Sequence, residues 1–314
     1  MNIVFFGSSS FGGPSLESLL DSKHRIFCVV TQPDRQKGRG LVKVATPIKI
    51  LALNKRLKFY QPDNVNSTQS IELLKSLKAD LFIVIAYGQI LSADILRTPK
   101  IFSINLHASL LPKYRGAAPI NWAIINGETL TGLTIIKMNE KIDAGEIILQ
   151  KKVDIEPTDT EITLEERLAK QGADLLLECL NKMEEDSLSL LRQDETLVSF
   201  APKLNKNDGL IDWQKEAVKI QNLIRGVEEW PAAFTYYKGK ILKIFKVTIS
   251  SPTDNGLAGQ PGEVVRVDKK GILVATGKYN LLIEELQLQG GRRMKVEEFI
   301  CGHQICAGER LSKK

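Results

Sequence analysis

Asn105 and His107 are the two residues whose types and spacing most directly suggest chemistry. They lie two positions apart in the segment SINLHAS (103–109), at the end of an apolar stretch. If residues 102–107 form a strand, both side chains lie on one face, because side chains alternate along a strand. An amide can donate a hydrogen bond to a developing oxyanion, and an imidazole can move a proton. The pair could therefore hold one reacting carbonyl group.

A carboxylate that could complete this site is Asp143, in the segment KIDAGE (141–146). A turn at this place can return the carboxylate to the end of the neighbouring strand, where it would orient the imidazole or hold a proton. Asp and Gly between two strand-like runs also make an ordinary turn, and a single strand histidine is often structural. From the residues alone, both interpretations stay open.

The elements that must position these residues alternate between strand-like and helix-like segments. Continuous apolar runs interleaved with helices predict a mostly parallel sheet covered on both faces, which binds ligands at the carboxyl ends of its strands. The expected strands are residues 3–7, 26–31, 57–61, 81–86, 101–107, 131–138 and 147–153. The expected helices are residues 14–20, 47–53, 71–77, 117–126 and 164–183.

The last third of the chain has a different pattern. Periodicity loosens around residues 186–208, and short strand-like runs with Gly and charged turns follow at 234–237, 242–249, 262–267, 271–276 and 280–288. Such runs are typical of a small β-barrel. We therefore expect a catalytic domain over residues 1–188, a linker over 189–207 and a β-barrel domain over 208–314.

Composition narrows the class of protein. The chain has 314 residues and 43% hydrophobic content, enough for two cores, and its four scattered cysteines indicate a reducing compartment. No leader-like segment and no long apolar run is present, so we expect a cytoplasmic protein that makes no membrane contact. Residues 1–200 are electrically balanced, and residues 201–314 carry the whole net charge of +6. This asymmetry favours a polyanionic partner or serves solubility alone.

A connection that contains several basic residues and two glycines follows the second expected strand. It is longer than most such connections and carries Arg35, Lys37, Arg39 and Lys43. Long connections in this position are often functional, and these cations could bind phosphate groups. A solvated loop is the alternative.

The sequence shows no sign of a dinucleotide-binding fingerprint, a phosphate-binding P-loop or a metal site. The segment GSSSFGG (7–13) follows a strand, yet it has neither the glycine spacing of a dinucleotide fingerprint nor the lysine of a P-loop. No Cys or acidic residue lies at ligand spacing around His107, and CGHQIC (301–306) supplies too few ligands for a zinc site. We therefore expect neither a nicotinamide dehydrogenase nor a metal centre.

Several motifs together resemble one enzyme family. Asn105-x-His107, followed by SLLPKYRGAAPI (109–120) and Asp143-x-Gly145, resembles the 10-formyltetrahydrofolate-dependent formyltransferases. The segments TQPDR (31–35), GRG (38–40), AYG (86–88) and IDW (211–213) are similar to those of the members that act on an aminoacylated tRNA. The resemblance covers nearly the whole chain. One departure is GSSSF (7–11), where the family more often has a Gly-Thr-Pro-x-Phe turn.

The resemblance implies a fold and a reaction. The fold would be α/β, with a Rossmann-like, mostly parallel sheet in the catalytic domain, followed by a small C-terminal OB-like β-barrel. The reaction would be formylation of the α-amine of methionyl initiator tRNA, with 10-formyltetrahydrofolate as the formyl donor and without a metal. We also expect a monomer with no obligatory protein partner.

The resemblance also implies roles for particular residues. Asn105 and His107 would bind and polarise the formyl group, with Asp143 as their acidic partner. The residues expected to contact folate are Ser109, Leu110, Leu111, Pro112, Ala86, Tyr87 and Gly88. Arg39 in the basic connection would approach the acceptor stem of the tRNA.

Two alternatives share part of this evidence. A related formyltransferase or deformylating hydrolase, acting on an amino sugar, a purine precursor or water, would share Asn105, His107 and Asp143 without needing the basic connection. A tRNA-binding protein with an inert catalytic domain would need the basic regions alone.

Overall fold

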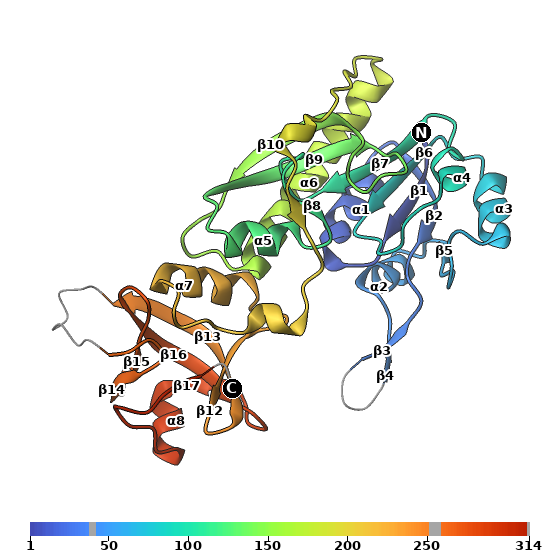
Figure 1. Cartoon of the computed structure of the whole chain (residues 1–314). Coiled ribbons are helices and arrows are strands. Elements are labelled where there is room, and N and C mark those ends of the chain that lie inside the picture. The colour runs from blue at the N-terminus through green and yellow to red at the C-terminus, as the bar shows by residue number, and fades with distance from the viewer. Residues whose placement is uncertain (38–41, 251–258, 313–314) are drawn as a thin grey trace. The chain divides into compact units, whose positions relative to one another are not determined.

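The chain forms two compact units. The computed structural model describes residues 1–37, 42–250 and 259–312 (Figure 1). The first unit comprises Met1–Pro119, Leu130–Asp154 and Glu165–Pro202, and the second comprises Ile120–Thr129, Ile155–Leu164 and Lys203–Lys314. The segment 189–207, expected as a linker, is divided between the units at Pro202.

A seven-stranded sheet is the centre of the first unit. Its strand order is β10-β9-β7-β6-β1-β2-β5. The five strands from β7 to β5 are parallel, and β9 and β10 are antiparallel to their neighbours. This arrangement confirms the mostly parallel sheet that the sequence predicts. The bounds are β1 Asn2–Gly7, β2 Arg25–Val30, β5 Phe59–Tyr60, β6 Leu81–Ile85, β7 Phe102–His107, β9 Leu130–Lys137 and β10 Glu146–Asp154.

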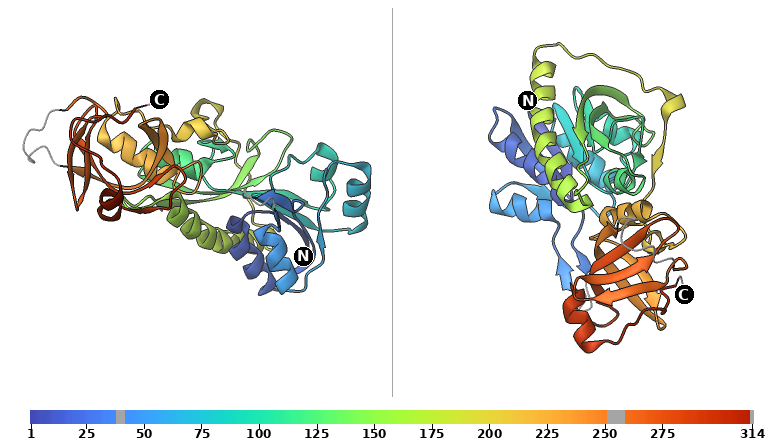
Figure 2. Two further views of the ribbon diagram at one scale, coloured as in Figure 1. Left: turned by 90° about the horizontal axis from the view of Figure 1, so that it is seen from below. Right: turned by 90° about the vertical axis from the view of Figure 1, so that its left-hand side faces the viewer.

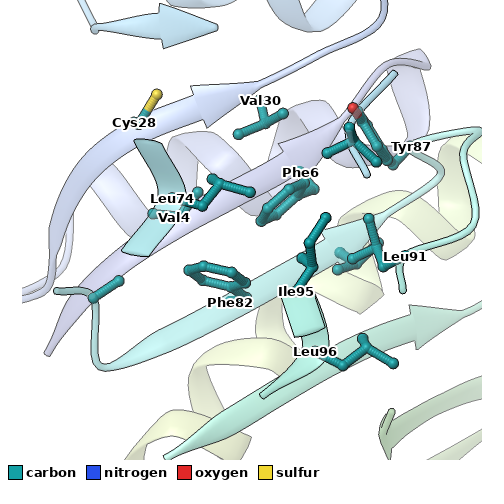
Figure 3. Packing of buried hydrophobic residues seen from close by; sticks show 13 residues of the cluster. Val4, Phe6, Cys28, Val30, Leu74, Phe82, Tyr87, Leu91, Ile95 and Leu96 are labelled. Carbon is teal, nitrogen blue, oxygen red and sulfur yellow. The ribbon is translucent and has the colours of Figure 1, made fainter. Parts of the chain in front are cut away.

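Helices cover both faces of this sheet. Alternation along β1 sends Val4 and Phe6 into one core, with Phe82 and with Ile95 of α4 (Figure 3). Phe5 and Gly7 face the other way, and Ile48 of α2 lies beside Gly7 on that side. The bounds are α1 Gly13–Leu20, α2 Pro47–Asn54, α3 Thr68–Ser76, α4 Ala93–Leu96 and α6 Glu161–Glu184. A further helix, α5 (Pro119–Ile125), belongs almost wholly to the second unit.

Local sequence signals set the starts of two of these helices. The hydroxyl of Thr46 accepts a hydrogen bond from the backbone N–H of Lys49, and Pro47 occupies the first turn of α2. Ser67 caps α3 in the same way. Both are strong N-terminal signals, because the side-chain oxygen satisfies a backbone donor that has no partner within the helix.

Two short strand pairs depart from the sequence expectation. The basic connection after β2 is not a plain loop, because β3 (Arg35–Lys37) pairs with β4 (Val42–Val44). Within the expected linker, β11 (Phe200–Ala201) pairs in parallel with β8 (Arg115–Gly116). Pairings of two or three residues leave no periodic apolar signal, so the sequence pattern does not reveal them.

The second unit is a small antiparallel barrel. Its strands run in the order β12-β13-β16-β15-β14, with β17 beside β16, and they curve around a common core (Figure 2). Residues near the C-terminus close the barrel, since Ser312 bridges Tyr236 of β12 and Arg310 bridges Glu263, the residue before β14. The bounds are β12 Ala233–Tyr237, β13 Lys240–Ser250, β14 Val264–Asp268, β15 Gly271–Ala275, β16 Asn280–Leu288 and β17 Met294–Lys295.

Two helices of the second unit are absent from the sequence prediction. They are α7 (Ala217–Gly226), which packs against β13, and α8 (Val296–Gly302). Short 3₁₀ helices complete the chain at η1 (Ser10–Gly12), η2 (Glu195–Leu197) and η3 (Lys206–Gly209). Within the described ranges, no helix combines the length and the apolar character needed to cross a membrane.

Candidate active site

Asn105 and His107 lie at the carboxyl end of β7, between β6 and β9. Asn105 is in register with Val84 of β6 and with Ile136 of β9. Its Nδ2 atom donates a hydrogen bond to Oδ1 of Asp143 at 3.3 Å. Nδ1 of His107 lies 3.6 Å from Oδ2 of the same carboxylate. The structure thus brings together the three residues that the sequence analysis singles out.

The hydrogen bond to Tyr114 determines which nitrogen of His107 faces this site. The imidazole is buried, and its Nε2 atom lies 2.9 Å from the backbone carbonyl oxygen of Tyr114. Because a carbonyl oxygen only accepts, Nε2 carries a hydrogen. Nδ1 is therefore the nitrogen that can gain or lose a proton in front of Asp143. A distance of 3.6 Å exceeds a direct hydrogen bond and leaves Nδ1 available to a substrate atom.

A strained turn between β9 and β10 presents the Asp143 carboxylate. Asp143 has a φ of +51°, in the left-handed region that asparagine and aspartate tolerate better than most residues. The backbone N–H of Gly116 donates to Oδ2 at 2.9 Å and fixes the carboxylate. A Cβ atom on Gly145 would collide with the carbonyl oxygen of Lys137. Glycine at position 145 is therefore a steric requirement of this turn.

Gln193 holds the backbone of the same turn. Its Nε2 atom donates to the carbonyl oxygens of Asp143 and Gly145, each at 2.8 Å. The buried guanidinium of Arg115 donates to Oε1 of Gln193 at 3.0 and 2.8 Å. Arg115 also pairs with Glu195 at 2.9 Å. These bonds connect the expected linker to the Asp143 turn.

Sequence reasoning missed Gln193 because its segment has no periodicity and looks like a connection. Arg115 could have indicated such a partner, because it is a charged residue within the segment that carries the family resemblance. The pairing of β8 with β11 also holds the linker segment beside Arg115. Next to this pairing, the backbone N–H of Tyr114 donates to Oγ of Ser199 at 2.9 Å. A Cβ atom on Gly116 would meet the carbonyl oxygen of Ala201 at 2.5 Å.

Ser109 and Leu111, two of the expected folate contacts, have buried side chains. The Ser109 hydroxyl donates to the carbonyl oxygen of Lys113 at 2.6 Å. Thr134 of β9 accepts from the backbone N–H of Leu111 at 3.1 Å and donates to the carbonyl oxygen of Ser109 at 2.6 Å. These side chains hold the loop after β7 in shape, and Leu110 and Pro112 are half-buried.

The other expected folate contacts follow β6. Ala86 and Gly88 are exposed and have φ values of +47° and +89°. Tyr87 between them is buried against Phe6 in an edge-to-face contact of 5.5 Å between ring centroids (Figure 3). Tyr87 therefore anchors the segment while the backbone on either side of it stays open to a ligand.

The basic residues after β2 are only partly described. Arg35 and Lys43 are exposed on the paired strands β3 and β4. Lys37 lies in β3 by its backbone, and Arg39 lies outside the described residues. The structure thus gives the position of two of the four expected phosphate-binding cations.

The cysteines of the described chain do not supply an activated nucleophile at this site. Burial raises the pKa of Cys28 to about 11 and that of Cys179 to about 12, so both stay protonated thiols near neutral pH. Cys301 and Cys306 are exposed on the second unit. Among the described residues, no three His, Cys, Asp or Glu side chains gather as metal ligands would.

Comparisons with known proteins relate this chain to one enzyme family. A family model for formyl transferases matches residues 1–180, and a model for the formyl transferase C-terminal domain matches residues 203–304. The methionyl-tRNA formyltransferase of Geobacter sulfurreducens is 41% identical over 313 residues, which cover 100% of this chain and 97% of that protein.

Solved structures share the fold at lower sequence identity. WlaRD, a sugar 3N-formyl transferase, is 20% identical with a TM-score of 0.65, covering 93% of this chain and 99% of that one. The methionyl-tRNA formyltransferase from Clostridium thermocellum is 15% identical with a TM-score of 0.55, covering 80% of this chain and 94% of that one. Because the full-length match at 41% identity is to one enzyme of the family, this chain belongs to the methionyl-tRNA formyltransferase family of formyl transferases.

Proposed function

We propose that this protein transfers the formyl group of 10-formyltetrahydrofolate to the α-amine of methionyl initiator tRNA. The observation that supports this most is the convergence of Asn105, His107 and Asp143 at the carboxyl end of β7. An amide donor, an imidazole and a carboxylate around one point can stabilise the oxyanion and move the protons in acyl transfer to an amine.

Asn105 and His107 act on the formyl oxygen. One N–H of the Asn105 amide bonds to Asp143, and the amide has a second N–H to donate. A protonated Nδ1 of His107 donates as well. Attack by the amine forms the new C–N bond and gives a tetrahedral oxyanion, which these two donors stabilise. Removing one donor of this kind typically costs about 3 kcal/mol of transition-state stabilisation.

Asp143 and His107 handle the protons. Asp143 accepts the proton that the α-amine nitrogen must lose when it bonds to the formyl carbon. As the bond between the formyl carbon and the folate nitrogen breaks, that nitrogen leaves with a proton delivered through Nδ1 of His107. Nε2 stays on the Tyr114 carbonyl throughout and holds the ring in place. We infer direct transfer, because among the residues that the structure describes no activated Ser or Cys lies beside Asn105 and His107.

The open backbone at Ala86 and Gly88 and the half-buried Leu110 and Pro112 fit a flat heterocycle that combines apolar faces with hydrogen-bonding edges. These residues would hold the formyl donor, which supplies the one-carbon group and an amine leaving group. The basic strands β3 and β4 and the positively charged residues 201–314 would bind the tRNA backbone. We propose that the enzyme works as a cytoplasmic monomer with a catalytic domain over 1–188 and a tRNA-binding barrel over 208–314.

The test is a direct assay of formyl transfer. Purified protein is incubated with 10-formyltetrahydrofolate and methionyl initiator tRNA, and formylmethionyl-tRNA is measured over time. We expect Asn105→Ala to lower kcat about 10²- to 10³-fold while leaving the KM for tRNA nearly unchanged. Asn54→Ala, at the exposed end of α2, is the matched control and should retain full activity.

Two results would contradict the proposal. Turnover of an amino sugar, a purine precursor or water without formylation of the tRNA would indicate a different member of the superfamily. Loss of tRNA binding in Asn105→Ala would mean that this residue does not act at the formyl group.

A further inference from the structure

Gln32 carries a buried hydrogen-bond donor that no other part of the described chain uses. The residue lies two positions beyond the end of β2, at the carboxyl edge of the sheet, and it is 9% exposed. Its Nε2 atom is buried and has no hydrogen-bond partner within the described ranges. A buried donor without a partner costs about 1 to 3 kcal/mol, so such a group calls for a physical explanation.

The other polar atoms of Gln32 are all engaged. Its backbone N–H donates to Oγ of Ser8 at 3.1 Å, and its carbonyl oxygen accepts from Nε2 of Gln61 at 2.8 Å. Oε1 accepts from the guanidinium of Arg35 at 3.2 Å. Because a guanidinium only donates, this bond determines which end of the amide is oxygen. The free end is therefore a donor, and its ligand must be an acceptor.

This free amide end is placed next to the open backbone after β6. A Cβ atom on Gly88 would lie 3.8 Å from Nε2 of Gln32. Gly88 itself is exposed with a φ of +89°, and Oγ of Ser8 connects the two segments by donating to the carbonyl oxygen of Tyr87 at 2.8 Å. The amide thus stands at the switch point between β1 and β6, where sheets of this type bind ligands.

The strand order indicates which of the two substrates lies beside Gln32. Strands β1 and β6 lie between β2 and β7, so the ends of β2 and β7 are about 14 Å apart at normal strand spacing. The reacting amine is at the β7 end, and the basic strands β3 and β4 leave from the β2 end. The acceptor substrate of the proposed function would span these two places, and Arg35 of β3 is the residue that bonds to Gln32.

We propose that the free amide N–H of Gln32 donates a hydrogen bond to the terminal aminoacyl-nucleoside of the acceptor tRNA. This inference rests on the proposed function and deepens it by naming a contact to the tRNA end. The acceptor atom is an oxygen or ring nitrogen of the methionyl ester, the ribose or the base. Arg35 keeps the amide in the donating orientation, so Gln32 is ready to bind before the tRNA arrives.

The decisive variants are Gln32→Leu and Gln32→Glu. Leucine removes the donor at similar volume, whereas glutamate keeps the contact with Arg35 and presents an acceptor-only oxygen to the ligand. We expect the KM for methionyl initiator tRNA to rise about tenfold in Gln32→Leu and further in Gln32→Glu. The KM for 10-formyltetrahydrofolate should stay within about twofold. Gln69→Glu, exposed on α3, is the matched control and should change neither constant.

Two further measurements separate binding from folding. A non-hydrolysable methionyl-adenosine, with an amide in place of the ester, should inhibit the wild-type enzyme, and its inhibition constant should rise in the variants by the same factor as the KM for tRNA. The thermal midpoint of free Gln32→Leu should match or exceed that of the wild type, because the substitution removes an unsatisfied donor.

Different failures have different meanings. If the wild type formylates methionyl-tRNA and Gln32→Glu keeps its KM for tRNA, the contact is absent and the proposed function stands. A change confined to the KM for the formyl donor would assign Gln32 to folate and overturn the inference. A wild type without activity on methionyl-tRNA would instead remove the proposed function.

Discussion

At the scale of single residues, the candidate site depends on groups that define each other's orientation. The Tyr114 carbonyl selects the nitrogen of His107 that faces the site, and the Gly116 N–H selects the direction of the Asp143 carboxylate. Both bonds use backbone atoms, which cannot change rotamer. The site is therefore preorganised before substrate binds, and preorganised donors contribute most to transition-state stabilisation.

Gln193 should be a positioning residue for this site. Gln193→Leu leaves the carbonyl oxygens of Asp143 and Gly145 without their side-chain donor, so the strained turn at Asp143 should relax. We expect kcat for formyl transfer to fall about tenfold or more, with both KM values nearly unchanged. Steady-state kinetics with each substrate varied in turn measures this.

The control for that substitution is Glu195→Gln. Glu195 is the exposed partner of Arg115, with 71% of its side chain accessible, and its loss should leave kcat within about twofold. Equal losses of kcat in both variants would mean that the Arg115 ion pair matters and that the bonds from Gln193 to the turn do not.

Glu161 makes stability depend on pH. Burial raises the pKa of this carboxyl to about 7 from an ordinary value of 4.5. One carboxyl oxygen accepts from the backbone N–H of Glu229, and the other has no partner within the described chain. The folded state therefore holds a proton that the unfolded state releases between these two pH values, and stability falls as pH rises through that window.

Glu161→Gln should remove this dependence. The substitution keeps the size of the side chain and cannot ionise, so the variant should be more stable than the wild type above pH 7, by roughly 3 kcal/mol at most. At about pH 4.5 the two proteins should unfold alike. Thermal unfolding of the substrate-free proteins across this pH range tests the prediction, and an equal stability difference at both ends would refute it.

At the scale of elements, the carboxyl edge of the parallel sheet gathers the candidate site from segments far apart in the sequence. The end of β7 supplies Asn105 and His107, and the turn between β9 and β10 supplies Asp143. The pairing of β11 with β8 adds the segment that carries Gln193. The first two contributions depend on strands of the central sheet, which are anchored in the core, and this explains how short loops can hold reacting groups in position.

The strand pair β3–β4 should contribute to the binding of tRNA and not to the binding of the formyl donor. Lys43 is exposed on β4, and Lys43→Gln removes one cation from the surface that we propose for phosphate contact. We expect a higher KM for methionyl-tRNA and a dependence of log KM on log salt that is shallower by about one. The formyl-donor KM should not move. Lys75→Gln, at an exposed position of α3, provides the comparison, and an identical effect there would exclude a specific contact.

At the scale of the whole molecule, charge is distributed unevenly along the chain. Residues 1–200 are balanced, and the net charge of +6 comes from residues 201–314, most of which form the barrel. A basic barrel next in sequence to a neutral catalytic unit suits an enzyme with one polyanionic and one small substrate. The two substrates should therefore respond differently to ionic strength.

Salt provides the corresponding test. Raising monovalent salt from about 50 to about 200 mM should lower kcat/KM for methionyl-tRNA by at least about tenfold, because bound phosphates must compete with counterions. The KM for 10-formyltetrahydrofolate should change little over the same range. A parallel decline for both substrates would point to loss of fold or of catalysis instead of weakened tRNA binding.

The sequence by itself determined the mostly parallel sheet, the β-rich last third and the three residues at the candidate site. Apolar runs and strand alternation are local properties of the sequence. A short motif of uncommon residue types can likewise be recognised from the sequence alone. The helix α8 and the pairing of β3 with β4 escaped prediction because their segments are short, so their patterns are weak. Helix α7 is ten residues long and buries Ala217, Ile220 and Ile224 on one face, so its pattern was present in the sequence although the prediction did not include it.

Only the tertiary structure decided which atoms of those residues face each other. The nitrogen of His107 at the site, the clamp of Gln193 on the Asp143 turn and the unpartnered donor of Gln32 all depend on contacts between segments distant in sequence. A hydrogen bond needs both partners within about 3 Å and in line. No pattern along the chain carries that information, because the chain must fold before the partners meet.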